Sequence, residues 1–127
     1  MPFGSYGNDE DAIKNAVRFI VEAGADIVKF ETDENNFAIV EKVIQAGVPV
    51  MAHIGIRPQS GDLKAKGRVA EQAIELVKLA KRICETDAKM LLLEGVATEV
   101  AKVITDTVVP LPTLNISTIF FFFLYTQ

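Results

Sequence analysis

Three short apolar runs, each ending in a charged or titratable side chain, constrain the fold of this chain most strongly. They cover residues 27–31, 48–53 and 90–94. Each run has the length of a buried strand and leads into polar residues, glycine or proline, which are typical of loops. Segments in which apolar residues recur at helical spacing separate the runs. This alternation predicts an α/β fold in which parallel strands are joined by right-handed crossover helices.

The helical spacing predicts four helices and leaves one long connection. The helices are expected at about residues 9–23, 37–46, 69–85 and 98–106. Asn8 or Asp9 is suited to cap the first helix. Residues 54–68 form the connection, and loops of this length without structure of their own are usually functional or mobile. Residues 108–116 are expected to begin a further strand.

Composition narrows the class of protein. A chain of 127 residues, 50% hydrophobic and 24% charged, is typical of one globular domain with a core. The net charge of −4 and the lack of a basic run exclude a general attraction for nucleic acid or anionic membranes. The single cysteine, Cys84, cannot form an internal disulfide, so a reducing compartment and a core or boundary role are expected.

The sequence shows no targeting or membrane signal. Residues 1–6 lack the basic and apolar regions of a signal peptide, and no run approaches the roughly 20 apolar residues of a membrane helix. We therefore expect a cytoplasmic protein.

Lys29 and Glu31 lie two positions apart on the first predicted strand, so their side chains leave the same face. Charges on a buried strand are costly unless they are paired, and an ion pair between the two is one interpretation. The other is a ligand site, in which the lysine polarises a carbonyl or carboxylate and the carboxylate binds a hard metal ion.

His53 and Glu94 end the other two predicted strands. His53 fits either a hydrogen-bonded structural histidine or a site residue. Four apolar residues lead directly into Glu94, and burial there would raise its pKa toward the range of a general base. The alternative for Glu94 is a loop or helix-capping carboxylate. Carboxyl ends of parallel strands are where α/β folds hold their ligands, so together these residues predict a site.

At these residues the chain resembles ketopantoate hydroxymethyltransferase (3-methyl-2-oxobutanoate hydroxymethyltransferase). The similar segments occur in the order of the family and extend over about residues 1–114. They are Met-Pro-Phe-Gly-Ser-Tyr at 1–6, Val-Lys-Phe-Glu at 28–31, Gly-Val-Pro-Val-Met-Ala-His-Ile-Gly-Ile-Arg-Pro-Gln at 47–59, Leu-Leu-Glu-Gly-Val at 92–96 and Glu-Val-Ala-Lys at 99–102.

The resemblance implies a TIM-type (β/α)₈ barrel of which this chain supplies about half. It implies hydroxymethyl transfer from 5,10-methylenetetrahydrofolate to α-ketoisovalerate, assisted by Mg²⁺. In this assignment Lys29 and His53 bind substrate, Glu31 supports the metal site, and Glu94 is the base. Small-molecule substrates, and a homo-oligomer at full length, are the implied partners.

The chain departs from the family pattern in three places. The two aspartates that bind the metal directly in the family lie N-terminal to everything here. Thr32, Asp33 and Glu34 stand where the family usually has glycines. After Leu114 the family continues with a Gly-Ile-Gly type of strand end, whereas this chain has an apolar tail with four consecutive phenylalanines at residues 120–123.

These departures lead to several expectations. Residues 1–114 are expected to form a partial barrel domain and residues 115–127 an atypical hydrophobic tail, either a buried strand, a partner-binding segment or an out-of-frame extension. The fragment itself is expected to be inactive and to associate through open sheet edges. Two alternatives stay open: another metal-dependent α-keto-acid enolate enzyme of the same superfamily, and a non-catalytic α/β module that binds a partner.

Overall fold

A computed structural model of the chain describes residues 1–61, 64 and 66–116. Strands and helices alternate along it, which confirms the predicted α/β class. In chain order the elements are α1 (Asp9–Val21), β1 (Val28–Glu31), α2 (Phe37–Gln45), β2 (Val50–Gly55), the 3₁₀ helix η1 (Pro58–Ser60), α3 (Ala70–Cys84), β3 (Met90–Glu94), α4 (Thr98–Thr107) and β4 (Thr113–Ile116).

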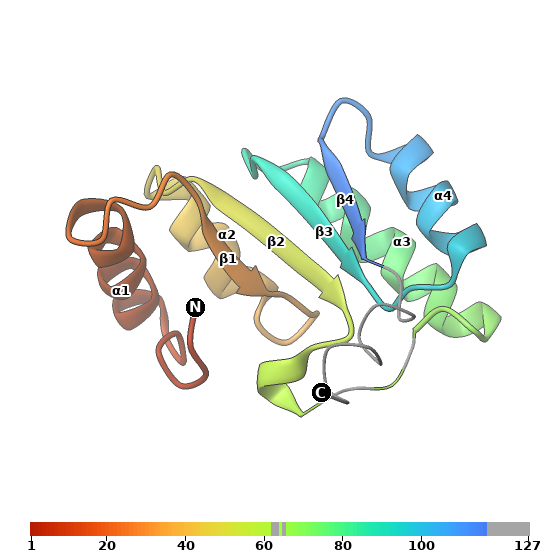
Figure 1. Cartoon of the computed structure of the whole chain (residues 1–127), viewed down its shortest axis with the longest axis horizontal. Helices are drawn as coiled ribbons and strands as arrows, with labels where there is room; N and C mark the ends of the chain where they lie inside the picture. The colour runs from red at the N-terminus through yellow and green to blue at the C-terminus, as the bar shows by residue number, and fades with distance from the viewer. Residues whose placement is uncertain (62–63, 65, 117–127) are drawn as a thin grey trace, which may run out of the picture.

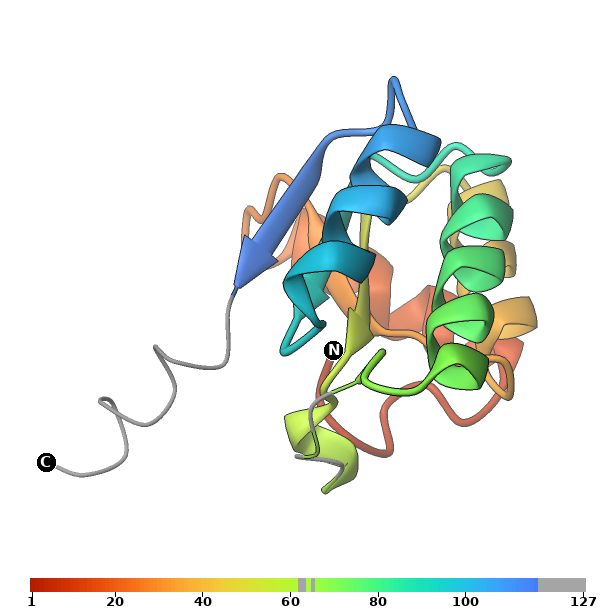
Figure 2. The same cartoon turned by 90° about the vertical axis from the view of Figure 1, so that its right-hand side faces the viewer.

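The four strands form one parallel sheet in the order β1-β2-β3-β4. Helices α2, α3 and α4 lie on one side of this sheet, and α1 packs beside α2 near the β1 edge (Figures 1 and 2). Sequential parallel strands with their helices on a single side are the arrangement of successive β/α units in a barrel. The other face of the sheet carries none of the described helices.

The core lies between the sheet and its helices. Alternate strand residues supply its sheet side, because successive side chains on a strand point to opposite faces. These buried residues are Val28, Phe30, Val50, Ala52, Ile54, Leu91 and Leu93. The helices add residues such as Val40, Ile83 and Ile104. The residues between the core-facing ones therefore point to the opposite face of the sheet. We call it the uncovered face because none of the described helices packs on it, although several of its side chains are buried by loops and neighbouring residues.

Local sequence explains where the first helices begin. Asn8 caps α1, since its side-chain Oδ1 accepts a hydrogen bond of 2.9 Å from the backbone N–H of Asp11. Before α2 the polar turn folds on itself: the carboxylate of Asp33 accepts hydrogen bonds from the backbone N–H groups of Asn35 and Asn36. This turn fixes the backbone immediately after Glu31.

Strand β2 continues two residues beyond the predicted end at His53. Gly55 has a φ of 105°, and a Cβ at this position would lie 2.2 Å from the carbonyl oxygen of Glu94. Only glycine allows the ends of β2 and β3 to approach so closely. The next amide, Ile56 N–H, donates to the same carbonyl at 2.7 Å.

The remaining expectations concern the chain after β2. Pro58–Ser60 in the long connection forms η1, and β4 falls within the strand expected at residues 108–116. Cys84 is half-buried against the core, and its thiol lies 3.2 Å from the carbonyl oxygen of Val108. The part of the predicted tail beyond Ile116 lies outside the described residues. None of the helices in the described ranges is long and apolar enough to cross a membrane.

Candidate functional site

The sheet register brings the four predicted site residues to one region. Lys29 and Glu31 come from β1, His53 from β2 and Glu94 from β3. Glu31 is the register partner of His53, and Glu94 is the partner of Gly55. All four side chains therefore belong to the uncovered face, and three of them lie at or near the carboxyl ends of their strands.

His53 and Glu94 form a close and deeply buried pair. Nε2 of His53 lies 3.0 Å from Oε2 of Glu94, and the exposed fractions of the two side chains are 0% and 6%. The two groups are not aligned as a hydrogen bond, and neither nitrogen of the imidazole has a hydrogen-bond partner among the described residues. The structural and the site interpretation of His53 both stay predictions. Buried polar atoms of this kind are rare and need an explanation.

The environment of His53 favours the neutral ring. Its pKa is lowered to about 4, first because burial penalises the charged imidazolium and next because the positive charge of Lys29 is near. The negative charge of Glu31 opposes this shift, and so does a weak polar contact with the backbone of Ile56. At neutral pH the ring is therefore an uncharged donor and acceptor.

The pKa of Glu94, unlike that of His53, is shifted upward. Burial raises its pKa above the ordinary value of 4.5, the charge of Lys29 lowers it, and the charge of Glu31 raises it. Glu94 ends strand β3, and the cap position of the following helix is Ala97. The loop or capping role considered for Glu94 is therefore not what the structure shows. A buried strand-end carboxylate with a raised pKa has the properties of a proton acceptor.

Glu31 is buried as well, with an exposed fraction of 3%. Its Oε1 accepts a hydrogen bond of 2.9 Å from the backbone N–H of Gln59 in η1. The side chain of Asn36 donates to the backbone carbonyl of Glu31 at 2.8 Å. Lys29, by contrast, is exposed on the same strand. The uncovered face thus presents an accessible cation next to three buried titratable groups.

The residues present fit only part of a metal site. Within the described ranges no three His, Cys, Asp or Glu side chains are placed to hold one metal ion together. Glu31 fits as a single carboxylate donor, bound directly or through water, because a hard cation such as Mg²⁺ prefers carboxylate and water oxygens. The other donors of such a site would come from outside these residues.

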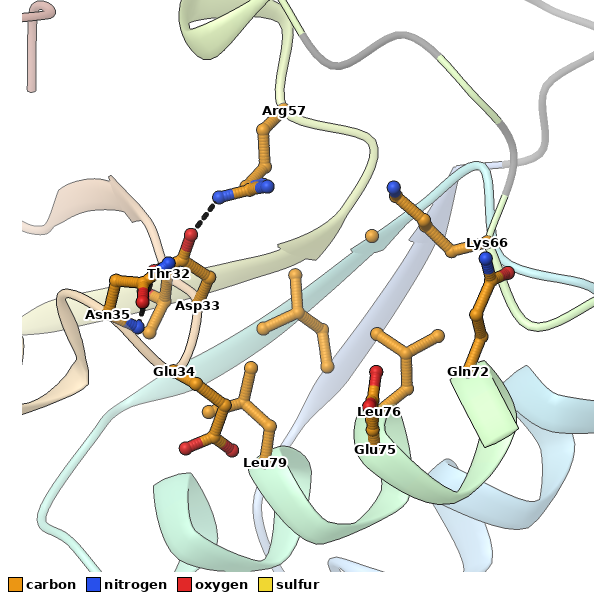
Figure 3. A pocket seen from close by; sticks show the side chains of 12 residues that line it. Thr32, Asp33, Glu34, Asn35, Arg57, Lys66, Gln72, Glu75, Leu76 and Leu79 are labelled. Atoms are coloured by element: carbon orange, nitrogen blue, oxygen red, sulfur yellow. Dashed lines mark hydrogen bonds and ion pairs between the residues drawn. The ribbon is translucent and has the colours of Figure 1, made fainter. Parts of the chain in front are cut away.

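A second group of residues lies in the loops that follow the strands. The pattern of strand ends did not identify it. Arg57, after β2, makes a hydrogen-bonded ion pair with Asp33 in the turn after β1. Figure 3 shows the two side chains pointing toward one another beside a pocket of about 290 Å³. Core-facing Ile54 and α3 residues Leu76 and Leu79 line this pocket, so it lies on the helix side of the sheet, away from the four predicted residues.

Comparison with known proteins finds similar sequences over most of the chain. The sequence pattern of the family described as ketopantoate hydroxymethyltransferase matches residues 1–118. Proteins named 3-methyl-2-oxobutanoate hydroxymethyltransferase are similar over most of the chain. The one from Campylobacter curvus is 42% identical over 112 residues, covering 85% of this chain and 42% of the relative. The one from Alkaliphilus metalliredigens is 45% identical, with coverages of 84% and 39%. The one from Clostridioides difficile is 41% identical, with coverages of 91% and 44%. This chain spans less than half the length of these relatives.

Proposed function

The chain belongs to the ketopantoate hydroxymethyltransferase family, and on this premise we propose that its uncovered sheet face is part of the active site of a hydroxymethyl transfer. The substrates are α-ketoisovalerate, 5,10-methylenetetrahydrofolate and water, and the products are ketopantoate and tetrahydrofolate. The burial of Glu94 at the end of β3, 3.0 Å from His53, is the observation that carries the proposal. It gives the site a carboxylate with a raised pKa where a carbon acid must lose a proton.

Each residue of the face has a distinct role in this reaction. Glu94 takes the proton from C3 of the keto acid, and the enolate carbon then attacks the methylene carbon of the folate. A C–C bond forms while the bond from the methylene carbon to one folate nitrogen breaks. Water then bonds to the same carbon through its oxygen, which becomes the hydroxyl group, while the bond to the second nitrogen breaks. Each nitrogen keeps its electron pair and takes up a proton, one from C3 and one from the water. Lys29, the exposed cation, binds the carboxylate of the keto acid. His53 hydrogen-bonds to substrate as a neutral ring, which its low pKa ensures.

Glu31 is the residue of this chain that would support Mg²⁺. A bound Mg²⁺ would draw electron density from the oxygens of the keto acid and so make its C3 proton more acidic. The hydrogen bond from Gln59 orients one oxygen of the Glu31 carboxylate at the end of β1. The buried and unaligned nitrogens of His53 are groups that a bound substrate would satisfy.

A second candidate keeps the enolate chemistry and changes the acceptor. The ion pair of Asp33 with Arg57 places charge in the turn and loop that follow Glu31 and His53. Asp33 of this pair stands where the family usually has glycine. This difference favours another metal-dependent enzyme that forms an enolate from an α-keto acid. Such an enzyme would exchange the C3 proton without transferring a hydroxymethyl group.

The test uses the Campylobacter curvus relative, because this chain aligns with only 42% of it. The aligned segment of that enzyme is replaced by the matching segment of this chain, and deuterium exchange at C3 of α-ketoisovalerate is followed with Mg²⁺ by NMR. Glu94→Gln should slow exchange by at least about 100-fold. Glu99→Gln, an exposed carboxylate on α4, is the matched control and should change exchange by less than about twofold.

The outcomes separate the candidates. Exchange that is unaffected by Glu94→Gln contradicts the base assignment. Exchange that depends on Glu94, together with ketopantoate formation when 5,10-methylenetetrahydrofolate is added, supports the hydroxymethyl transfer. Exchange that depends on Glu94 without ketopantoate formation favours the second candidate.

A further inference from the structure

We propose that Arg57 and Asp33 are positioning residues for Glu31: their ion pair holds η1 over the end of β1, so that the backbone N–H of Gln59 fixes the Glu31 carboxylate. The inference rests on the proposed function for the purpose of that carboxylate. The contacts themselves are independent of any reaction.

The first step is the anchoring of Asp33 to the backbone around Glu31. Oδ1 of Asp33 accepts hydrogen bonds from the backbone N–H groups of Asn35 and Asn36, at 2.9 and 3.0 Å. The side chain of Asn36 in turn accepts from the N–H of Asp33 at 2.9 Å and donates to the carbonyl of Glu31 at 2.8 Å. These four contacts fix the turn relative to the end of β1. Asp33 is therefore a fixed point next to Glu31.

The second step is the ion pair that the other carboxylate oxygen of Asp33 makes. Oδ2 of Asp33 accepts from Nη1 of Arg57, which stands at the N-cap of η1. The side chains of both residues are only 24% exposed, so the pair is partly withdrawn from water. Ion pairs that are exposed contribute little, and partial burial with hydrogen bonding makes this one stronger. It joins residues 24 positions apart in the chain.

The third step connects the pair to the proposed metal carboxylate. Gln59 follows Arg57 by two residues, and its N–H donates to Oε1 of Glu31 at 2.9 Å. The loop residue that reaches Glu31 is thus held by the turn that begins just after Glu31. Groups that orient a metal-binding carboxylate influence metal affinity even without touching the metal. Asp33 and Arg57 act in this way, through Gln59.

The experiment measures the hydrogen bond from Gln59 N–H to Glu31 directly in the 127-residue chain. Amide hydrogen exchange is measured by NMR in the wild type and in Arg57→Gln, Asp33→Asn and the double variant. Gln59 N–H should exchange at least about tenfold faster in either single variant, which corresponds to loss of an ordinary hydrogen bond. The double variant should add little, because both changes remove one interaction. Arg57→Lys keeps the charge and should restore part of the protection.

Two controls keep the result specific. Glu34→Gln removes the neighbouring ion pair with Arg82 of α3 and leaves Arg57 untouched, so Gln59 N–H should stay protected. Ile56 N–H, which donates to Glu94, should stay protected in every variant and reports that the strand ends are folded. Unchanged exchange at Gln59 in Arg57→Gln and Asp33→Asn overturns the proposal. Equal loss of protection in Glu34→Gln also overturns it, since the effect is then a general loosening of the turn.

A second readout links the pair to the metal. In the Campylobacter curvus enzyme carrying this segment, Arg57→Gln should raise the Mg²⁺ concentration for half-maximal C3 exchange by about tenfold or more. The keto acid concentration for half-maximal rate should change by less than about twofold, because Lys29 is not part of the contact. If Gln59 loses protection but the Mg²⁺ dependence is unchanged, the positioning of Glu31 has no bearing on the metal, and the proposal is overturned. If the wild-type segment supports no exchange at all, the proposed function fails, whereas the effect on Gln59 exchange is tested independently.

Discussion

Nε2 of His53 lies 3.0 Å from Oε2 of Glu94 across the β2–β3 pairing, with both side chains nearly inaccessible to water. The pKa of His53 is shifted down and that of Glu94 is shifted up, in both cases mainly by burial. Each group therefore favours its uncharged form more than it does in water. Neighbouring titratable groups whose pKa values depart from their ordinary ranges are a recurring mark of acid–base sites.

The burial of His53 predicts a pH-dependent stability. Its pKa is about 4 in the folded chain and ordinarily 6.5, so the unfolded chain binds the extra proton between these values. The contribution of His53 to folding is therefore complete above about pH 6.5 and is lost as the pH falls toward 4. The loss amounts to about 3 kcal/mol at 1.36 kcal/mol for each pH unit.

The measurement is urea unfolding between pH 4 and 7 for the wild type and for His53→Gln. The difference between their free energies of unfolding should narrow by about 3 kcal/mol as the pH falls, since the glutamine does not titrate. Two pH profiles that run parallel would show that the imidazole is not buried as described.

The charge of Lys29 predicts a coupled shift at two residues. It lowers the pKa of both His53 and Glu94. Lys29→Met removes this charge, so both pKa values should rise, that of His53 from about 4. NMR titration of the imidazole and the carboxyl carbon measures both in one sample. Lys14→Met, an exposed lysine on α1, is the control and should leave both values unchanged. A pKa shift at only one of the two residues would show that Lys29 is not close to both.

The fold was largely predictable because its signals are local. Runs such as residues 90–94 carry their own strand pattern, and Asn8 precedes its helix as a cap should. The extension of β2 to Gly55 was missed, because it depends on the approach of Gly55 to the carbonyl of Glu94, which is a contact between strands. Nothing in the sequence near Gly55 specifies that partner.

The placement of the candidate site residues was predictable, whereas their contacts were less so. The positions of Glu31, His53 and Glu94 at or near strand ends, and of Lys29 on the same face, could be identified from chain alternation alone. The ion pair of Asp33 with Arg57 could not, since each residue lies in a separate loop and a charged loop residue is usually solvated. The available signal was the departure at residues 32–34 from the family pattern, together with the arginine in the following connection. Neither specified a partner.

The raised pKa of Glu94 predicts the pH dependence of C3 exchange in the Campylobacter curvus enzyme that carries this segment. A base works only when it is ionised, so the rate should fall as the pH drops through the pKa of Glu94. The midpoint of this acid limb should lie above 4.5, the ordinary value for a glutamate. Lys29→Met should move the midpoint further up, because Lys29 favours the ionised form. If the midpoint lies at or below pH 4.5, or if Lys29→Met lowers it, the titrating group is not Glu94.

The contact between the ends of β2 and β3 predicts a large difference between two glycines that both have positive φ. Gly47 has a φ of 86° and Gly55 a φ of 105°, so alanine is strained at each. A Cβ at Gly47 meets nothing within 4 Å, whereas one at Gly55 would lie 2.2 Å from the backbone oxygen of Glu94. Gly47→Ala should therefore cost about 1–2 kcal/mol of unfolding free energy, from conformation alone. Gly55→Ala should cost about 3–5 kcal/mol, because the strand ends must also separate.

Urea unfolding at pH 7 compares the two variants under one condition. Because the Gly55→Ala change displaces the carbonyl of Glu94, it should also expose Ile56 N–H to hydrogen exchange, whereas Gly47→Ala should not. Failure of Gly55→Ala to fold while Gly47→Ala folds agrees with the same contact. Equal destabilisation by the two substitutions would show that β2 and β3 do not meet closely at Gly55. The burial of Glu94 beside His53 would then require a different explanation, since the position of Glu94 depends on that approach.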